Sequence, residues 1–149
     1  MTDVAFYHLQ RSRLEDALPM LLGKTLDAEK CAVVIAGSRE RVGHLDGVLW
    51  ASDPASWLPH GTGRDGAPEE HPIWLTNADE NPNNASFLFL TDGATSSKVG
   101  DYERCFVMFD GNDPTALSAA RDHWRTMKTE GHQLTYWKQG EQGWAKQDI

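Results

Sequence analysis

The sequence has few or none of several features that mark whole classes of protein. It has only two cysteines, Cys31 and Cys105, in 149 residues, too few for the disulfide framework of a small secreted domain. Both lie in apolar runs of strand length, so we expect two buried, reduced thiols. No window approaches the ~18 apolar residues of a membrane span, and the N-terminal MTDVAFYHLQ lacks the apolar core of a signal peptide. These absences predict a cytoplasmic protein without a membrane partner.

An excess of basic residues is also missing. Lys and Arg total 14 against 22 Asp and Glu, which gives a net charge of −8. A protein that holds nucleic acid by its phosphates usually has a basic balance or a basic stripe. The totals therefore argue against DNA as the main direct partner, although they leave room for a local basic patch.

Patterns that carry catalysis are absent or incomplete. There is no G-x-S-x-G elbow, and the apolar neighbours of both cysteines disfavour a reactive thiolate. Gly61 to Gly66 matches G-x-G-x-x-G, but a phosphate loop must leave a strand and open a helix, and Ala-Pro-Glu-Glu-His-Pro follows here. His60 and His71 lack the close spacing of zinc ligands. We therefore expect no catalytic residue, cofactor or metal. The alternative is a small nucleotide- or metal-dependent enzyme that uses the Gly/His loop of residues 60–71.

What the sequence does contain is an alternation of strand and helix patterns. Apolar runs of strand length alternate with segments whose leucines fall at helical spacing. This alternation predicts a single three-layer α/β domain over residues 1–149 with a mostly parallel sheet. We expect a flexible loop near 60–72 and a frayed tail near 140–149. The expected strands are 4–9, 31–37, 73–77, 86–93, 104–111 and 132–138, and the expected helices begin near Glu15 or Asp16, after Ser38 and at Pro114.

The helix expected over Pro114–Glu130 carries the strongest candidate site. At 100° per residue, three cations share one stripe of the helix: Arg121, Arg125 and Lys128. Leu117 and Trp124 border this stripe, and Ala120 and Met127 form the side that faces the core. Arginine binds carboxylates with two parallel hydrogen bonds, and an indole offers a wall to an apolar side chain. The pattern favours a short acidic peptide that ends in an aromatic residue. The alternative is a solvated helix face with Trp124 in the core.

Two tryptophans, Trp50 and Trp57, flank the expected end of the second helix. Tryptophan is enriched among the residues that anchor interfaces, and two of them around a turn can form an exposed apolar patch for a partner. Packing in the core is the alternative for both.

Four motifs follow one another along the chain: Phe6-Tyr7-x-Leu9, Leu45-Asp46-x-x-Leu49-Trp50, Ser56-Trp57-Leu58-Pro59-His60 and Gly131-x-x-Leu134 with Trp137-Lys138. In their order, their spacing and the total length they resemble the chi subunit of the bacterial DNA polymerase III holoenzyme. The resemblance covers nearly the whole chain. It implies an α/β protein of mononucleotide-binding-like topology that binds no nucleotide.

The resemblance also implies a function in DNA replication. Such a protein is a non-catalytic accessory subunit that links the clamp-loader complex to the single-stranded DNA-binding protein, SSB, and meets DNA only indirectly. One surface would bind the psi subunit or another clamp-loader component, and Trp50 and Trp57 fall where relatives contact psi. Another would bind the acidic, phenylalanine-terminated tail of SSB through Arg121, Trp124, Arg125 and Lys128, beside Leu117.

Overall fold

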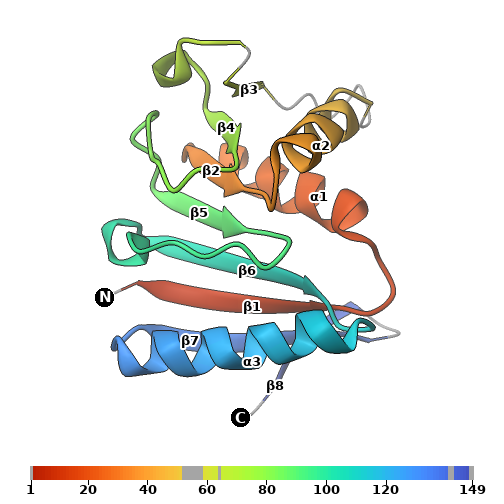
Figure 1. Cartoon of the computed structure of the whole chain (residues 1–149). Helices are drawn as coiled ribbons and strands as arrows, with labels where there is room; N and C mark the ends of the chain where they lie inside the picture. The colour runs from red at the N-terminus through yellow and green to blue at the C-terminus, as the bar shows by residue number, and fades with distance from the viewer. Residues whose placement is uncertain (1, 52–58, 64, 141–142, 148–149) are drawn as a thin grey trace.

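The protein folds into one mixed sheet with helices on both faces, which confirms the three-layer α/β prediction (Figure 1). The computed structural model describes residues 2–51, 59–63, 65–140 and 143–147. Over these residues the strand order is β3-β4-β2-β5-β6-β1-β7-β8, and every neighbouring pair is parallel except β7 and β8. The strands are β1 (Asp3–Leu9), β2 (Ala32–Ile35), β3 (His60–Thr62), β4 (Ile73–Thr76), β5 (Phe87–Leu90), β6 (Arg104–Asp110), β7 (Gln133–Gly140) and β8 (Gly143–Gln147); the helices are α1 (Leu14–Asp27), α2 (Arg39–Ala51) and α3 (Pro114–Thr129), with short 3₁₀ turns η2 (Pro68–Glu70) and η3 (Val99–Asp101).

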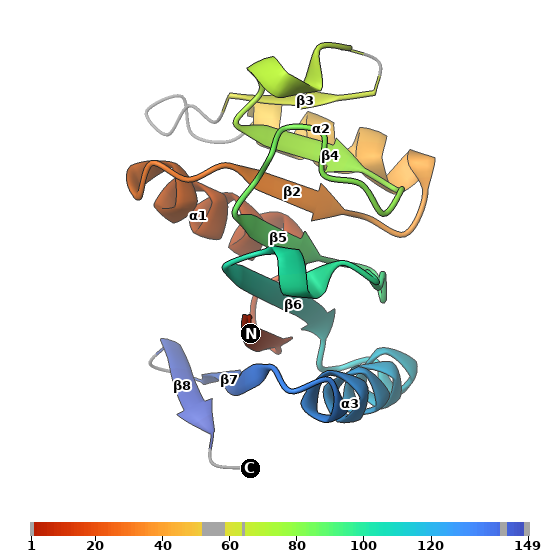
Figure 2. The same cartoon turned by 90° about the vertical axis from the view of Figure 1, so that its left-hand side faces the viewer.

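Two apolar cores lie on the two faces of the sheet. α1 and α2 cover one face, where Leu18, Leu22 and Leu45 pack against strand residues such as Phe89. α3 covers part of the other face, where Ala120 and Met127 join a core built on Phe6 and Val107. Figure 2 shows α1 and α3 on opposite sides of the sheet. Strands buried on both faces read as continuous apolar runs, which is why the sequence located them well.

The crossover connections change from one face of the sheet to the other between the neighbouring strands β1 and β6. These strands are parallel neighbours, with Leu9 opposite Asp110 at their carboxyl ends. The chain leaves β1 for α1 on one face and leaves β6 for α3 on the other. Such a switch point opens a crevice at the carboxyl edge of a parallel sheet. No helix in the described part of the chain is long and apolar enough to cross a membrane.

Three details of the prediction are corrected by the structure. Residues 143–147, expected in a frayed tail, form β8 because Gly143 turns the chain at a φ of +102° and Trp144 packs edge to face on Tyr7 at 5.0 Å. His60–Thr62, expected in a flexible loop, form β3 and are buried. Cys105 is buried as expected, and burial raises the pKa of its thiol, but Cys31 is only half-buried because it lies just before β2.

Candidate functional site

Helix α3 is fixed at its start and along one side. The backbone N–H of Thr115 donates to the Asp113 carboxylate at 3.0 Å, and Pro114 occupies the first helical position. Ala120 and Met127 are buried against the sheet, while Arg121, Arg125 and Lys128 are exposed. The predicted division of this helix into a core side and a basic side is therefore confirmed.

Trp124 lies on the border between those two sides. Its indole meets the buried ring of Phe6 edge to face at 5.1 Å and that of Tyr136 at 5.9 Å. Both Trp124 and Leu117 are half-buried and pack against the core on this face. Neither is a wholly internal residue, so each presents part of its apolar surface to solvent beside the arginines.

A hollow of about 500 Å³ opens where α3 meets the edge of the sheet. We call it the basic hollow. It is lined by residues from α3, β1, β7 and β8: His8, Leu117, Ala120, Arg121, Trp124, Arg125, Tyr136, Lys138 and Gln147. Four of the five residues proposed from the sequence are thus brought together. The fifth, Lys128, is exposed on α3 but lies outside this lining.

The charge of the basic hollow has one sign. Arg121, Arg125 and Lys138 line it, and none of its described lining residues is a carboxylate. Arg125 reaches Asp122 at 3.3 Å, but both side chains are more than 70% exposed, so this ion pair holds the guanidinium only weakly. Burial raises the pKa of Tyr136, and the nearby Arg121 charge partly offsets that effect. A carboxylate entering the hollow would meet donors that face solvent.

The inner wall of the hollow is a hydrogen-bonded pair. His8 Nδ1 and Tyr136 Oη lie 2.6 Å apart, and His8 is only 6% exposed. Its Nε2 has no hydrogen-bond partner among the described residues. The ring lies so close to Gly111 that a Cβ there would fall 1.9 Å from Nε2, so this position requires glycine. Burial and the charge of Lys138 lower the pKa of His8, and Asp110 partly opposes them.

Four lining residues were missed from the sequence: His8, Tyr136, Lys138 and Gln147. Three of them lie on strands next to α3, and Gln147 lies on β8, where no strand was expected. Helix periodicity places residues on one helix only. The available signal was the polar alternation of Tyr136 and Lys138 in a strand expected to follow the basic helix.

Trp50 occupies a second exposed position. It is 63% exposed near the end of α2, and its ring lies 4.8 Å from that of His60 at a tilt of 53°. His60 is itself held by Asp46, with Nε2 and Oδ1 3.0 Å apart. Core packing is therefore excluded for Trp50, whose exposed indole rests against the His60 ring. Trp57, the other tryptophan proposed for this surface, lies outside the described residues.

The glycines of the 60–71 segment do not form a phosphate loop. Gly61 lies in β3 against His71, whose ring a Cβ would meet at 2.5 Å. Among the described residues that follow β3, there are only a turn and η2, rather than a helix whose N-terminus would face a phosphate. No group of three potential metal-binding side chains occurs among the described residues. The geometry gives the proposed enzyme alternative no support.

The junction between β1 and α1 is occupied by a side chain of the protein itself. The backbone N–H groups of Gln10, Arg11 and Ser12 all donate to Oε1 of Gln139, at 3.2, 2.8 and 2.8 Å. Nε2 of Gln139 donates to the Ser12 hydroxyl at 2.7 Å. In nucleotide-binding α/β proteins donors at this place cradle a phosphate. Here they are already satisfied.

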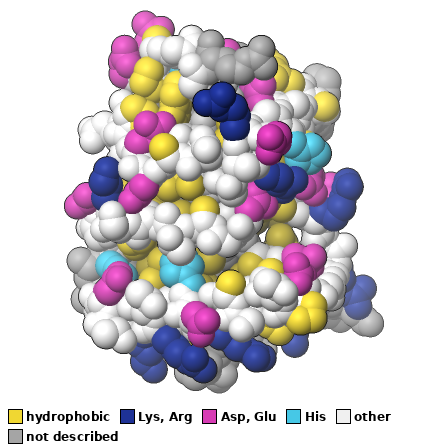
Figure 3. Space-filling view, viewed as in Figure 1, with side chains coloured by type: hydrophobic (Ala, Val, Ile, Leu, Met, Phe, Trp, Pro, Cys, Tyr) yellow, Lys and Arg dark blue, Asp and Glu magenta, His cyan; other side chains and the backbone are white. Residues whose placement is uncertain are grey.

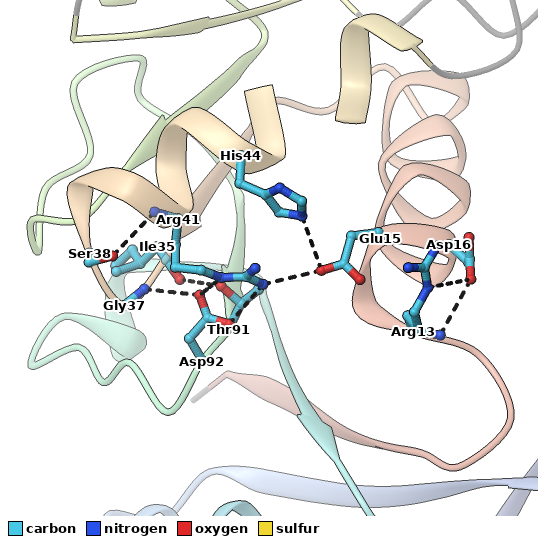
Figure 4. A network of polar contacts seen from close by, with 10 residues as sticks. All are labelled: Arg13, Glu15, Asp16, Ile35, Gly37, Ser38, Arg41, His44, Thr91 and Asp92. Atoms are coloured by element: carbon cyan, nitrogen blue, oxygen red, sulfur yellow. Dashed lines mark hydrogen bonds and ion pairs between the residues drawn. The ribbon is translucent and has the colours of Figure 1, made fainter. Parts of the chain in front are cut away.

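A second polar network ties the carboxyl edge of the sheet together (Figure 4). Arg41 of α2 donates from Nε and Nη2 to the two carboxylate oxygens of Asp92, at 3.1 and 3.2 Å, and from Nη2 to Glu15 at 3.3 Å. The backbone N–H of Gly37 also donates to Asp92. The hydrogen bonds to Asp92 raise the pKa of Arg41, which stays charged. This network joins α1, α2 and the segment after β5.

Comparison with known proteins points to one family. Residues 1–135 match the model of the family described as "DNA polymerase III chi subunit, HolC". A protein of Rickettsia prowazekii (strain Madrid E), named a probable DNA polymerase III subunit chi, is 28% identical over 109 residues. That alignment covers 71% of this chain and 66% of the Rickettsia protein, just under two thirds of its length.

Proposed function

The chain belongs to the chi subunit family of DNA polymerase III, and on that premise we propose that it links the clamp-loader complex to SSB during DNA replication. In this proposal it is a non-catalytic, cytoplasmic accessory subunit. It binds the acidic C-terminal tail of SSB in the basic hollow and the psi subunit on the surface that carries Trp50.

The observation that carries the proposal is the composition of the basic hollow. Cations at its rim stand beside an indole and a leucine that are partly open to solvent. An acidic peptide with an apolar end needs both features in one place. Arg121 and Arg125 offer donors for a terminal carboxylate, and Trp124 and Leu117 offer the contact for the last side chain.

The size of the hollow also favours a peptide end. A volume of about 500 Å³ accommodates one or two side chains and lies within the range of small-ligand clefts. The walls come from α3 and three strands, so the site is formed before any ligand arrives. A preformed site avoids part of the ordering cost of association.

Trp50 supports the proposed psi surface. Exposed tryptophan is the residue type most typical of energetic anchors at interfaces, and on this chain only Met20 and Trp50 are exposed large apolar side chains among the described residues. Trp57 is proposed for the same surface on the basis of the sequence.

Direct binding of DNA is a weaker use of the same cations. Non-specific affinity for DNA grows with the number of phosphates that a protein neutralises. The basic hollow offers three cations on a protein of net charge −8. We therefore propose contact with DNA only through SSB.

The proposal is tested by reconstitution with purified partners. The full chain, as wild type or as Arg121→Glu, is passed over immobilised SSB, over SSB lacking its C-terminal tail and over the psi subunit. We expect capture by intact SSB and by psi, loss of SSB capture on removing either the tail or Arg121, and unchanged capture of Arg121→Glu by psi. Equal capture by intact and tail-less SSB would show that the basic hollow does not read the tail.

A further inference from the structure

A second and larger hollow lies on the other side of α3. Its volume is about 1050 Å³, and it runs between α3 and the segment that follows β5, over the carboxyl ends of β5, β6 and β1. Figure 3 shows histidine and hydrophobic side chains in this depression, Asp and Glu around it, and Lys and Arg gathered along the lower edge of the molecule. We call it the acidic hollow.

Helix α3 separates the two hollows. Arg121 and Arg125 line the basic hollow, whereas Asp122 and Glu130 line the acidic one. Arg121 and Asp122 are adjacent in sequence, so the sign of charge changes within one residue around the helix. A uniformly solvated helix face would mix charges of both signs, whereas here the two signs line different hollows.

The rim of the acidic hollow has an excess of carboxylates. Six carboxylates and three guanidinium groups line it. One of those guanidiniums, Arg41, is held by two of the carboxylates, Asp92 and Glu15. The other four carboxylates belong to Asp110, Asp113, Asp122 and Glu130, and all four residues are exposed. Asp122 lies 3.3 Å from Arg125, and Glu130 lies 3.3 Å from His132.

The floor of this hollow is apolar. Leu90 of β5 and Val107 and Phe109 of β6 form it, each at most 7% exposed. Ala94 and Ala119 stand at its sides and add apolar surface that is more open to solvent. Burying apolar surface contributes roughly 25 cal/mol per Å². A partner that only paired charges would leave this surface unused.

The position of the acidic hollow favours a ligand, and the residues that line it determine the charge of that ligand. The crevice at the β1 and β6 switch point is where open α/β sheets usually bind ligands. The backbone donors that would hold a phosphate there are taken by Gln139. With carboxylates in excess around the rim, an anion is repelled and a cation is attracted.

We infer that the acidic hollow docks a cationic segment of a partner protein, one that carries lysine or arginine alternating with apolar side chains. The apolar groups of that segment contact the floor, and its cations pair with Asp110, Asp122 and Glu130. This surface is distinct from the basic hollow and from Trp50. A segment bound in the acidic hollow leaves the basic hollow and Trp50 accessible. The cationic segment, the SSB tail and psi can therefore bind the same subunit at the same time.

The inference is tested on the full chain with two labelled synthetic peptides, one alternating lysine and leucine and one alternating lysine and serine. We expect the leucine peptide to bind roughly tenfold more tightly than the serine peptide, because only it uses the floor. Asp122→Asn with Glu130→Gln should weaken the leucine peptide by about tenfold, and Ala119→Trp, which fills the hollow from an exposed position, should do the same. Glu69→Gln with Glu70→Gln, which removes two exposed carboxylates outside the hollow, is the matched control and should leave its binding unchanged.

Amide NMR spectra locate the bound peptide independently of these variants. Shifts confined to Ala94, Thr115 and Thr126, which line the acidic hollow, support the inference. Equal affinity for the two peptides, full binding by Ala119→Trp, or shifts spread over distant acids such as Glu69 and Glu70 would overturn it, since each indicates attraction by net charge alone.

Discussion

The indole of Trp124 meets the ring of Phe6 edge to face, with ring centroids 5.1 Å apart and planes at 64°. Phe6 is fully buried in β1. The contact with this buried ring therefore fixes the orientation of the Trp124 indole, including the part that is exposed to solvent. The apolar wall of the basic hollow therefore has a fixed orientation, and the two arginines stand beside it.

Reversing the charge of Arg121 is expected to weaken binding of the SSB tail by roughly ten- to a hundredfold. A hydrogen bond to a charged group contributes about 1.5–3 kcal/mol, and Arg121→Glu also places a like charge in the site. Fluorescence polarisation of a labelled tail peptide measures the change. Lys128→Glu should have a smaller effect because Lys128 does not line the hollow.

The matched control for that reversal is Arg39→Glu, which changes an exposed arginine on α2 away from the basic hollow. Its affinity for the tail peptide should stay within about twofold of wild type. An equal loss in Arg39→Glu and Arg121→Glu would mean that only the total charge matters.

Shortening Trp124 is expected to affect both stability and binding. Trp124→Ala removes the contacts to Phe6 and Tyr136, and for a half-buried aromatic we expect a loss of about 2 kcal/mol in the free energy of unfolding. Trp124→Phe keeps an aromatic ring and should lose less than about 1.5 kcal/mol. Urea unfolding measures the first effect and peptide titration the second. A Trp124→Ala protein as stable as wild type would contradict the packing described here.

Removing Trp50 is expected to separate partner binding from folding. Because the indole is 63% exposed, Trp50→Ala should change the free energy of unfolding by no more than about 0.5 kcal/mol. Its affinity for psi should fall by at least about tenfold if the indole anchors that interface. Met20→Ala is the control, since Met20 is the second exposed large apolar side chain among the described residues, and it should bind psi normally. Loss of psi binding in both variants would argue against a specific anchor.

Stability is expected to fall as the pH drops below neutrality, partly through His8. Its pKa is lowered in the folded protein from an ordinary value of 6.5 by burial and by Lys138, so the unfolded chain binds the proton more readily. The contribution is complete above that value and is lost as the pH falls towards the folded pKa. His8→Gln can keep a hydrogen bond to Tyr136 without titrating, so unfolding between about pH 7 and pH 5 should depend less on pH. An unchanged pH dependence would contradict the lowered pKa.

The sequence predicted those parts of the fold that short-range patterns encode. Apolar runs located the buried strands. The helical period of 100° per residue correctly placed Ala120 and Met127 on the buried side of α3 and the three cations on its exposed side. The neighbours of α3 were not predictable in the same way. His8 and Tyr136 come together across β1 and β7, 128 positions apart, and no local period encodes such a pairing.

The corrections have the same physical origin. Polar residues around Gly143 suggested a frayed tail, but pairing with β7 and the packing of Trp144 on Tyr7 make a strand there. His60 lies in a segment rich in glycine and acid, yet parallel pairing with β4 buries it. Gln139 gave no signal at all, because its role depends on three backbone donors from the loop after β1.

The most direct measurement of the central claim is a titration of the full chain with a labelled SSB-tail peptide, with and without its terminal phenylalanine, at low and high salt. We predict one site with a dissociation constant on the order of micromolar, which weakens as salt rises because the arginines are exposed. Binding should be lost with the phenylalanine or in Arg125→Glu. Equal binding of both peptides by wild type and by Arg125→Glu would contradict the assignment of the basic hollow as the tail site.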